Sequence, residues 1–255
     1  MSKGNSRQAR SDRRGNRQQQ QQFQEPNYEA AFEDISEVVK PRKSKPLEAK
    51  NEAQGQLISN ILSKDITFAT GPAGTGKTYI TATLALEALL SKRINKILIT
   101  RPMQACGEDM GHLPGEIEDK YAPWVRPVLD VFRDHMTEGA LTYALKNKKI
   151  EFCPLQFMRG SSFKHTWAIL DEAQNITPEQ MKMFLTRIGE GSKLIVSGDI
   201  RQSDLKDGRG VYQLSGLADA VTRLKTVPEI GMVEFTRADI VRHGLVRKIL
   251  DKYED

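Results

Sequence analysis

The residues whose spacing most directly implies chemistry are the eight from Gly71 to Thr78. They fit the pattern G-x-x-x-x-G-K-[ST] at every position: Gly71, Pro72, Ala73, Gly74, Thr75, Gly76, Lys77 and Thr78. Glycines let backbone N–H groups turn toward phosphate oxygens, and the helix expected to follow adds the positive end of its dipole. Lys77 brings a point charge to the outer phosphates, and the Thr78 hydroxyl is a ligand for Mg²⁺. The segment therefore predicts a binding site for ATP.

Two adjacent carboxylates, Asp171 and Glu172, are a second candidate for chemistry, directly after the apolar run Thr166–Leu170. At the end of a strand, Asp171 is expected to bind Mg²⁺ through its water shell. Glu172 is placed to polarise the water that attacks the terminal phosphate. Two acids after a strand are common on surfaces, so the pair gains its meaning from the phosphate loop upstream. Together the two segments predict ATP hydrolysis with Mg²⁺.

A third polar group, formed by Gly198, Asp199 and Gln202, follows the apolar run Leu194–Ser197. The carboxyl ends of parallel strands meet at one rim of a sheet, so this group is expected beside the first two. Gln202 is the candidate sensor of the γ-phosphate or of the attacking water. The alternative is a turn whose polar groups are solvated.

The elements that must position these segments are short apolar runs that alternate with stretches of helical periodicity, from Leu47 onward. Strands are predicted at Ile66–Thr70, Lys96–Thr100, Ile150–Cys153, Thr166–Leu170, Lys193–Ser197 and Met232–Phe235. Helices are predicted at Lys77–Leu90, Trp124–Met136, Thr137–Lys146, Pro178–Ile188, Gly216–Leu224 and Ile240–Lys252. Buried strands separated by helices predict an α/β fold in which helices cover both faces of a parallel sheet.

Composition divides the 255 residues into an arm over 1–46 and a folded domain over 47–255. The arm contains the run Gln18–Gln22 and has too little apolar surface to offset the entropy lost on ordering. Six Lys or Arg and one Asp in residues 1–22 give a local charge of +5, equal to the net charge of the whole chain. The arm is therefore a candidate contact for nucleic acid, and the domain itself is electrically balanced.

Cysteine usage and hydropathy predict where the protein is found. Two cysteines make neither a disulfide framework nor a zinc site, which favours a reducing compartment. No apolar run has the length of a membrane span, and none follows the basic N-terminus as in a signal peptide. The expected location is cytoplasmic, with no membrane partner.

Eight stretches of the sequence resemble the PhoH family of P-loop ATPases, relatives of the first half of the superfamily-one helicases. They are Gly71–Thr78, Arg101–Pro102, Gly111–Gly115, Met158–Gly160, Leu170–Asn175, Glu179–Arg187, Gly198–Asp199 and Val241–His243. The resemblance covers about 47–255 and implies a RecA-like fold that binds and hydrolyses ATP, often in connection with RNA. The sequence departs from the family pattern at Gln104, at Cys106 and in the longer insert Lys206–Gln213. These departures affect polynucleotide contacts rather than the nucleotide site.

The resemblance also implies roles for two residues outside the phosphate loop. Gln54 lies where such ATPases place a glutamine ahead of the loop, and its amide would read the adenine edge; the alternative is a solvated helix residue. Arg101 lies where the related helicases touch single-stranded nucleic acid; the alternative is a cap on the sheet edge. RNA or single-stranded DNA is accordingly a candidate partner.

Assembly is expected because the related helicases bind ATP between two such domains, the second of which supplies an arginine to the γ-phosphate. This chain has one such domain, so the arginine is expected from a neighbouring copy in a head-to-tail homo-oligomeric ring, for which the resemblance suggests a hexamer. Arg242 is the candidate, and a local salt bridge is its alternative role. The rival candidates for this arginine are Arg187, Arg201 and Arg237.

Two classes of function stay open on the sequence alone. One is an ATP-driven ring motor or remodeller that acts on RNA or single-stranded nucleic acid, with Glu172, Lys77, Gln202 and Arg242 as its catalytic residues. The other is a nucleotide-switched regulator or scaffold with slow ATP turnover and a protein partner. Stimulation of turnover by a polynucleotide separates them. A metabolic kinase would need a lid and an acceptor pocket, and the sequence indicates neither.

Overall fold

The computed structural model describes residues 46–102, 117–158, 160, 162–206 and 209–241. The arm, the segment 103–116 and the residues after Val241 lie outside the described residues. The expectations placed on the arm, on Gln104, on Cys106 and on Arg242 lie outside them as well.

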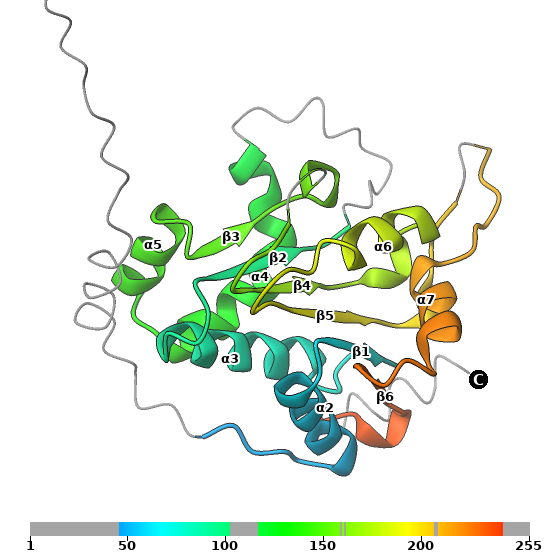
Figure 1. The fold of residues 1–255 in the computed structure, drawn as a ribbon, viewed down its shortest axis with the longest axis horizontal. Coiled ribbons are helices and arrows are strands. Elements are labelled where there is room, and N and C mark those ends of the chain that lie inside the picture. The colour runs from blue at the N-terminus through cyan, green and yellow to red at the C-terminus, as the bar shows by residue number, and fades with distance from the viewer. Residues whose placement is uncertain (1–45, 103–116, 159, 161, 207–208, 242–255) are drawn as a thin grey trace, which may run out of the picture.

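Six strands form one parallel sheet in the spatial order β3-β2-β4-β5-β1-β6 (Figure 1). They are β1 Ile66–Thr70, β2 Lys96–Thr100, β3 Ile150–Phe152, β4 Thr166–Leu170, β5 Lys193–Gly198 and β6 Ile230–Glu234. The predicted α/β class with a parallel sheet is confirmed. Thr70 at the end of β1 pairs with Gly198 at the end of β5, and Thr100 of β2 pairs with Leu170 of β4. The loops that follow these four strands therefore leave from one rim.

Helices cover both faces of the sheet (Figure 1). They are α2 Glu52–Ser63, α3 Lys77–Leu90, α4 Ile117–His135, α5 Glu138–Lys146, α6 Pro178–Leu185 and α7 Gly216–Leu224. The first four pack on one face of the sheet and the last two on the other. Successive residues of a strand point to opposite faces, so Ile97 and Ile99 contact the first group of helices and Leu98 lies on the side of the second. None of the helices in the described part of the chain combines the length and the apolarity that a membrane span requires.

Several helix ends differ from the predicted ones. Helix α2 is an addition, and it begins where the Asn51 side chain accepts the N–H of Gln54 at 2.8 Å. Helix α4 begins at Ile117, before the predicted start, and α6 ends at Leu185, before the predicted end. Of the helix predicted over Ile240–Lys252, only Ile240 and Val241 are described: Ile240 has an extended backbone after a short 3₁₀ turn, and the rest of the prediction lies outside the described residues.

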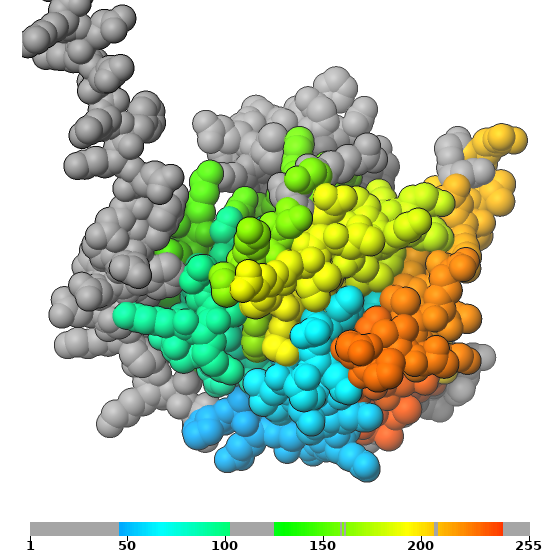
Figure 2. Space-filling model, viewed as in Figure 1, coloured from blue at the N-terminus to red at the C-terminus, as the bar shows by residue number. Residues whose placement is uncertain are grey.

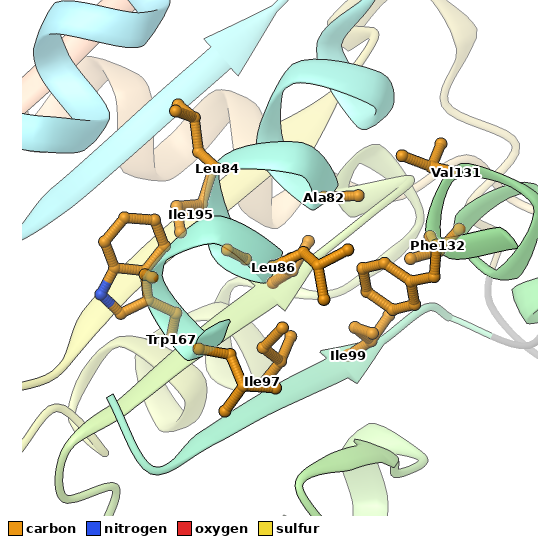
Figure 3. Close-up of a cluster of buried hydrophobic side chains, with 14 of the residues drawn as sticks. Ala82, Leu84, Leu86, Ile97, Ile99, Val131, Phe132, Trp167 and Ile195 are labelled. Carbon is orange, nitrogen blue, oxygen red and sulfur yellow. The ribbon is translucent and has the colours of Figure 1, made fainter. Parts of the chain in front are cut away.

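Burial of α3 on most of its sides fixes the end of the phosphate loop that leads into it. Nine of its fourteen residues are buried, mostly Ala, Leu and Thr, so most sides of the helix face the protein interior. Figure 3 shows Leu86 of α3 between Ile97 of the sheet and Phe132 of α4. Each such large apolar side chain contributes about 1.5–3 kcal/mol of burial free energy. The loop is therefore attached to a rigid element.

The first and last described elements lie side by side, as the blue and orange-red segments of Figure 2 show. Asn60 Nδ2 of α2 donates to the Met232 carbonyl of β6 at 3.4 Å, and Asn51 Nδ2 donates to the Asp239 carbonyl at 3.4 Å. The segment before the phosphate loop is thus joined to the segment that follows the last strand.

Candidate nucleotide-binding site

The phosphate loop lies between β1 and α3, as predicted for Gly71–Thr78. Gly71, Gly74 and Gly76 have φ values of 126°, 84° and 89°, which side chains rarely allow. At Gly71 the space is closed as well, because an added Cβ would collide with the Phe235 carbonyl. The glycines therefore permit the turn that directs backbone N–H groups toward one point.

Lys77 lies across the loop, half-buried. Its Nζ donates to the carbonyls of Gly71 and Pro72, each at 2.7 Å, and to Thr75 Oγ1 at 3.3 Å. Burial lowers the pKa of Lys77, and the carboxylates of Asp171, Asp199 and Glu172 oppose that shift. An anionic phosphate beside the ammonium group would act in the same direction as these acids.

Asp171 is 6% exposed and lies between the loop and β5. Ser197 Oγ donates to its Oδ1 at 2.8 Å, and Thr78 Oγ1 lies 3.4 Å from its Oδ2. Burial and the adjacent Glu172 raise the pKa of Asp171, while the Ser197 hydrogen bond and the charge of Arg101 lower it. A carboxylate that is buried beside another acid gains from a nearby cation, and hydroxyl and carboxylate oxygens are the ligands Mg²⁺ prefers. Thr78 and Asp171 therefore fit this ion.

Glu172 has a left-handed backbone, with φ of 54°, at the end of the loop after β4. Its Oε1 pairs with Arg101 at 3.0 Å, and its Oε2 accepts from Gln174 Nε2 at 2.7 Å. A left-handed conformation is uncommon for a residue with a side chain and is found at functional sites. Both carboxylate oxygens are thus held by side chains from two different segments.

These groups line one cavity of about 270 Å³. Of the residues predicted for the site, the cavity is lined by Gly71, Ala73, Gly74, Gly76, Lys77, Thr78, Asp171, Glu172 and Gln202. Gln202 is exposed and belongs to a short 3₁₀ turn, Ile200–Gln202, after β5. A second cavity, of about 300 Å³, shares Gly71, Asp199 and Gln202 with the first. The rim of the sheet therefore brings the three predicted segments together.

Gln54 is buried behind the loop, at 4% exposure, instead of being solvated. Its Nε2 donates to the Thr75 carbonyl at 2.9 Å, and its Oε1 accepts the N–H of Lys50 at 2.8 Å. Both ends of the amide contact backbone groups, so Gln54 joins α2 to the phosphate loop. Its contact with adenine stays a prediction.

The candidate arginines lie in different places. Arg187 donates through Nε to the Met183 carbonyl at 3.2 Å, within the turn that ends α6. Arg201 and Arg237 line the second cavity. Arg242 lies outside the described residues, but the residue before it is described: the Val241 N–H donates to the Gly74 carbonyl at 3.0 Å.

Sequence reasoning missed three contacts at this site, those of Ser197 with Asp171, Arg101 with Glu172 and Gln174 with Glu172. The structure places Arg101, a candidate for contact with nucleic acid or for a cap on the sheet edge, against the second acid of the pair. The signal available in the sequence was weak, since Arg101 and Ser197 lie near the ends of strands whose order was unknown.

The parallel sheet, the phosphate loop after β1 and the acid pair after β4 define a P-loop protein with an α/β fold. The chain belongs to the PhoH-like protein family, whose model matches residues 46–254. It is 43% identical over 217 residues to a PhoH-like protein of Synechocystis sp., covering 85% of this chain and 65% of the relative. It is 46% identical over 214 residues to Protein PhoH of Escherichia coli K12, covering 83% and 59%. The chain therefore spans about 60 to 65% of these relatives' length.

Two solved structures are similar at a lower level. The UvsW helicase from bacteriophage T4 aligns with a TM-score of 0.42 and 15% identity, over 82% of this chain and 67% of that one. The HK97 bacteriophage large terminase aligns with a TM-score of 0.43 and 14% identity, over 82% and 44%. Likenesses at this level carry no information about substrates.

Proposed function

We propose that this chain is a Mg²⁺-dependent ATPase that works as a homo-oligomeric ring, a hexamer, coupled to RNA or single-stranded nucleic acid. The observation that carries the hydrolytic part is that Lys77, Thr78, Asp171 and Glu172 line one cavity with the glycines of the phosphate loop. These four side chains cover charge neutralisation, metal binding and water activation, which phosphoryl transfer to water requires.

Each group has surroundings that suit its role. The loop N–H groups and Lys77 would bind the phosphates and offset the charge of the transition state. Thr78 and Asp171 would hold Mg²⁺, which when bound withdraws charge from the β- and γ-phosphate oxygens. Glu172 would orient the attacking water, and Gln202, which also lines the cavity, would sense the γ-phosphate.

The hydrolytic role is tested with Glu172→Gln, which keeps the size of the side chain but removes its charge. We expect this variant to bind ATP about as well as the wild type and to lose roughly 10²–10⁴-fold in kcat, the range of general-base catalysis. The measurement is Mg²⁺-dependent phosphate release alongside binding of a fluorescent ATP analogue. Hydrolysis by the variant at the wild-type rate would refute the assignment of Glu172.

The coupling to nucleic acid is supported by the local charge of +5 in residues 1–22 and by Arg101 at the rim that carries the cavity. The same hydrolysis assay, with and without single-stranded RNA or DNA, tests it. We expect turnover to rise with a polynucleotide and the rise to fall with salt, because phosphate contacts release counterions. Slow turnover that no polynucleotide changes would instead favour a nucleotide-switched regulator with a protein partner.

A further inference from the structure

Gln174 connects the proposed general base to the turn that ends β5. Its Nε2 donates to Glu172 Oε2 at 2.7 Å, and its Oε1 accepts the N–H of Asp199 at 3.1 Å. We propose that Gln174 is a positioning residue, which sets the orientation of the Glu172 carboxylate according to the position of the turn Gly198–Gln202. The inference rests on the proposed hydrolytic function. It adds a route by which a change at the turn that carries Gln202, the proposed γ-phosphate sensor, would alter the orientation of Glu172.

The amide of Gln174 suits both of its contacts, the one with Glu172 and the one with Asp199. Glu172 presents an acceptor and Asp199 presents an N–H donor, so the bridging group must donate at one end and accept at the other. Reversing the amide would place its NH₂ group against the N–H and its oxygen against the carboxylate. Gln174 is 2% exposed, so bulk water does not replace either contact. The orientation of the amide is therefore determined by its partners.

The Glu172 side chain needs such a support because little else restrains it. Its backbone is in the left-handed region, and its side chain is 39% exposed. Arg101 holds one oxygen, through a pair that is itself partly exposed and therefore weak. Without the second contact, the carboxylate is expected to sample several rotamers, and an orienting group must be held within a fraction of an ångström.

The turn side of the bridge is fitted closely to Gln174. A Cβ added at Gly198 would lie 2.5 Å from Gln174 Oε1, so the approach requires glycine. The Gly198 carbonyl accepts the N–H of Gly71 at 3.1 Å, and Ser203 Oγ donates to the Gln174 carbonyl at 3.0 Å. The end of β5 thus touches the first residue of the phosphate loop and the bridge. A shift of the turn is transmitted to Glu172 through two hydrogen bonds.

The decisive variant is Gln174→Glu, because it separates the two contacts. A carboxylate at this position still accepts the N–H of Asp199, so the turn keeps its support, but it cannot donate to Glu172 and repels it. We expect kcat for ATP to fall about tenfold or more near neutral pH, the order of effect of a misplaced general base, with KM changed less than about twofold. Nucleotide affinity stays, since the phosphate loop is untouched.

The pH dependence of kcat in the same variant gives a second measurement. It would not differ from that of the wild type if Gln174 served only to stabilise the fold. When protonated, the introduced carboxyl group donates again, so the ratio of variant to wild-type kcat should rise as the pH is lowered. The charged residues nearest to it are Glu172 and Asp171 on its own segment, Arg101 directly after β2, which pairs with Glu172, and Asp199 directly after β5. The nearby acids favour protonation of the new group, so its pKa should lie above that of a free carboxyl group.

Two further variants complete the experiment on the full-length chain. Gln174→Met removes both contacts at similar volume and should lose kcat at every pH. Gln180→Met is the matched control: Gln180 caps α6 through the Thr177 N–H at 2.9 Å, away from the cavity, and its loss should leave kcat unchanged. All variants are checked for thermal unfolding and for binding of a fluorescent ADP.

The outcomes distinguish a failure of the role proposed for Gln174 from a failure of the proposed ATPase function on which that role rests. Wild-type kcat in Gln174→Glu, or a kcat ratio that does not depend on pH, would show that Gln174 supports only the fold and would overturn the inference. Loss of folding or of ADP binding in both Gln174 variants would overturn it in the same way. Nucleotide binding without any Mg²⁺-dependent hydrolysis in the wild type would instead refute the ATPase, and the bridge with it.

Discussion

At the scale of single residues, burial in the cavity disfavours the charged forms of two ionisable groups that the proposed chemistry uses. Burial lowers the pKa of Lys77 and raises that of Asp171, so it disfavours the charged form of each. Both groups need their charge for the proposed chemistry. A phosphate beside Lys77 and a divalent cation beside Asp171 would stabilise these two charges, which the neighbouring protein groups stabilise only in part.

Asp171→Asn is therefore expected to stabilise the protein in the absence of nucleotide and Mg²⁺, raising Tm by a few degrees near neutral pH. Because the folded-state pKa of Asp171 is raised, its ionised carboxylate costs folding free energy at neutral pH. That cost disappears below the pKa of the unfolded chain, where both states are protonated. Thermal unfolding as a function of pH measures the effect.

The gain in Tm should shrink as the pH falls, and Mg²⁺ with ATP should stabilise the wild type more than Asp171→Asn. Asp130→Asn is the control, since Asp130 is exposed on α4 and pairs only at the surface with Arg133. A gain that grew toward acid pH would contradict the assigned cause.

At the scale of elements, α2 acts as a brace for the phosphate loop. Gln54, near its first turn, reaches the Thr75 carbonyl, and the packing of α2 against β6 holds the helix in place. An added Cβ at Gly76 would lie 3.0 Å from Gln54 Nε2, so the loop and the helix are in close contact. The shape of the loop thus depends on a segment about twenty residues before it in the chain.

Gln54→Met should test this brace, because it keeps the volume but leaves the Thr75 carbonyl and the Lys50 N–H without their partner. We expect a loss of about 1–3 kcal/mol in the free energy of unfolding, the cost of buried unsatisfied polar groups. Nucleotide affinity should fall as well, for ATP and ADP alike. Denaturant unfolding and nucleotide titration measure the two effects.

Ser63→Ala is the matched change on the same helix. Its hydroxyl donates to the Ser59 carbonyl at the surface, so neither stability nor affinity should move by more than about 0.5 kcal/mol. If Gln54→Met weakened ATP and ADP and left GTP unaffected, the adenine contact would be the better account of this residue.

At the scale of the whole molecule, the number of cationic side chains available to the γ-phosphate bears on whether neighbouring copies share a site. Among the described residues that line the cavity, the cations are Lys77 and Arg101, and Arg101 contacts Glu172. A further arginine for the γ-phosphate would come from the adjoining second cavity, which Arg201 and Arg237 line, from the residues after Val241, or from a neighbouring copy. Val241 touches its own phosphate loop, so an experiment on Arg242 has to separate action within a chain from action between chains.

Mixing two inactive variants makes that separation. Arg242→Ala keeps an intact phosphate loop, and Lys77→Ala keeps an intact Arg242. In a ring in which the arginine acts on the neighbour, mixed assemblies should regain part of the roughly 10³–10⁵-fold that an arginine finger contributes. Phosphate release and mass in solution are measured together. Mixed rings without any regained activity would count against a site shared through Arg242.

Removal of residues 1–22 tests the proposed role of the basic part of the arm. The six basic side chains in residues 1–22 can neutralise at most six phosphates, so the salt dependence of single-strand binding should weaken by up to about 4 in log–log slope. ATP turnover without polynucleotide should stay the same. An unchanged slope would show that the arm makes no contact with the strand.

Strands β1, β2, β4 and β5 were predictable because each is a short run of mostly buried residues bounded by polar turns, whereas β6, which is buried only at alternate residues, begins two residues before its predicted start. Helix ends were less so: α6 stops at Leu185 and α4 starts at Ile117, since caps and packing decide a boundary that periodicity leaves open. Helix α2 escaped prediction because its apolar face is narrow, with Leu57 and Ile61 as its buried apolar residues.

The sequence by itself determined the phosphate loop and the acid pair, because each is a contiguous run whose chemistry depends on neighbours in the chain. The tertiary structure alone decided what surrounds them: Arg101 and Gln174 on Glu172, Ser197 on Asp171, Gln54 behind the loop. Most of these contacts join residues 21 to 71 positions apart. They arise from the order of strands in the sheet, and no local pattern of residues encodes that order.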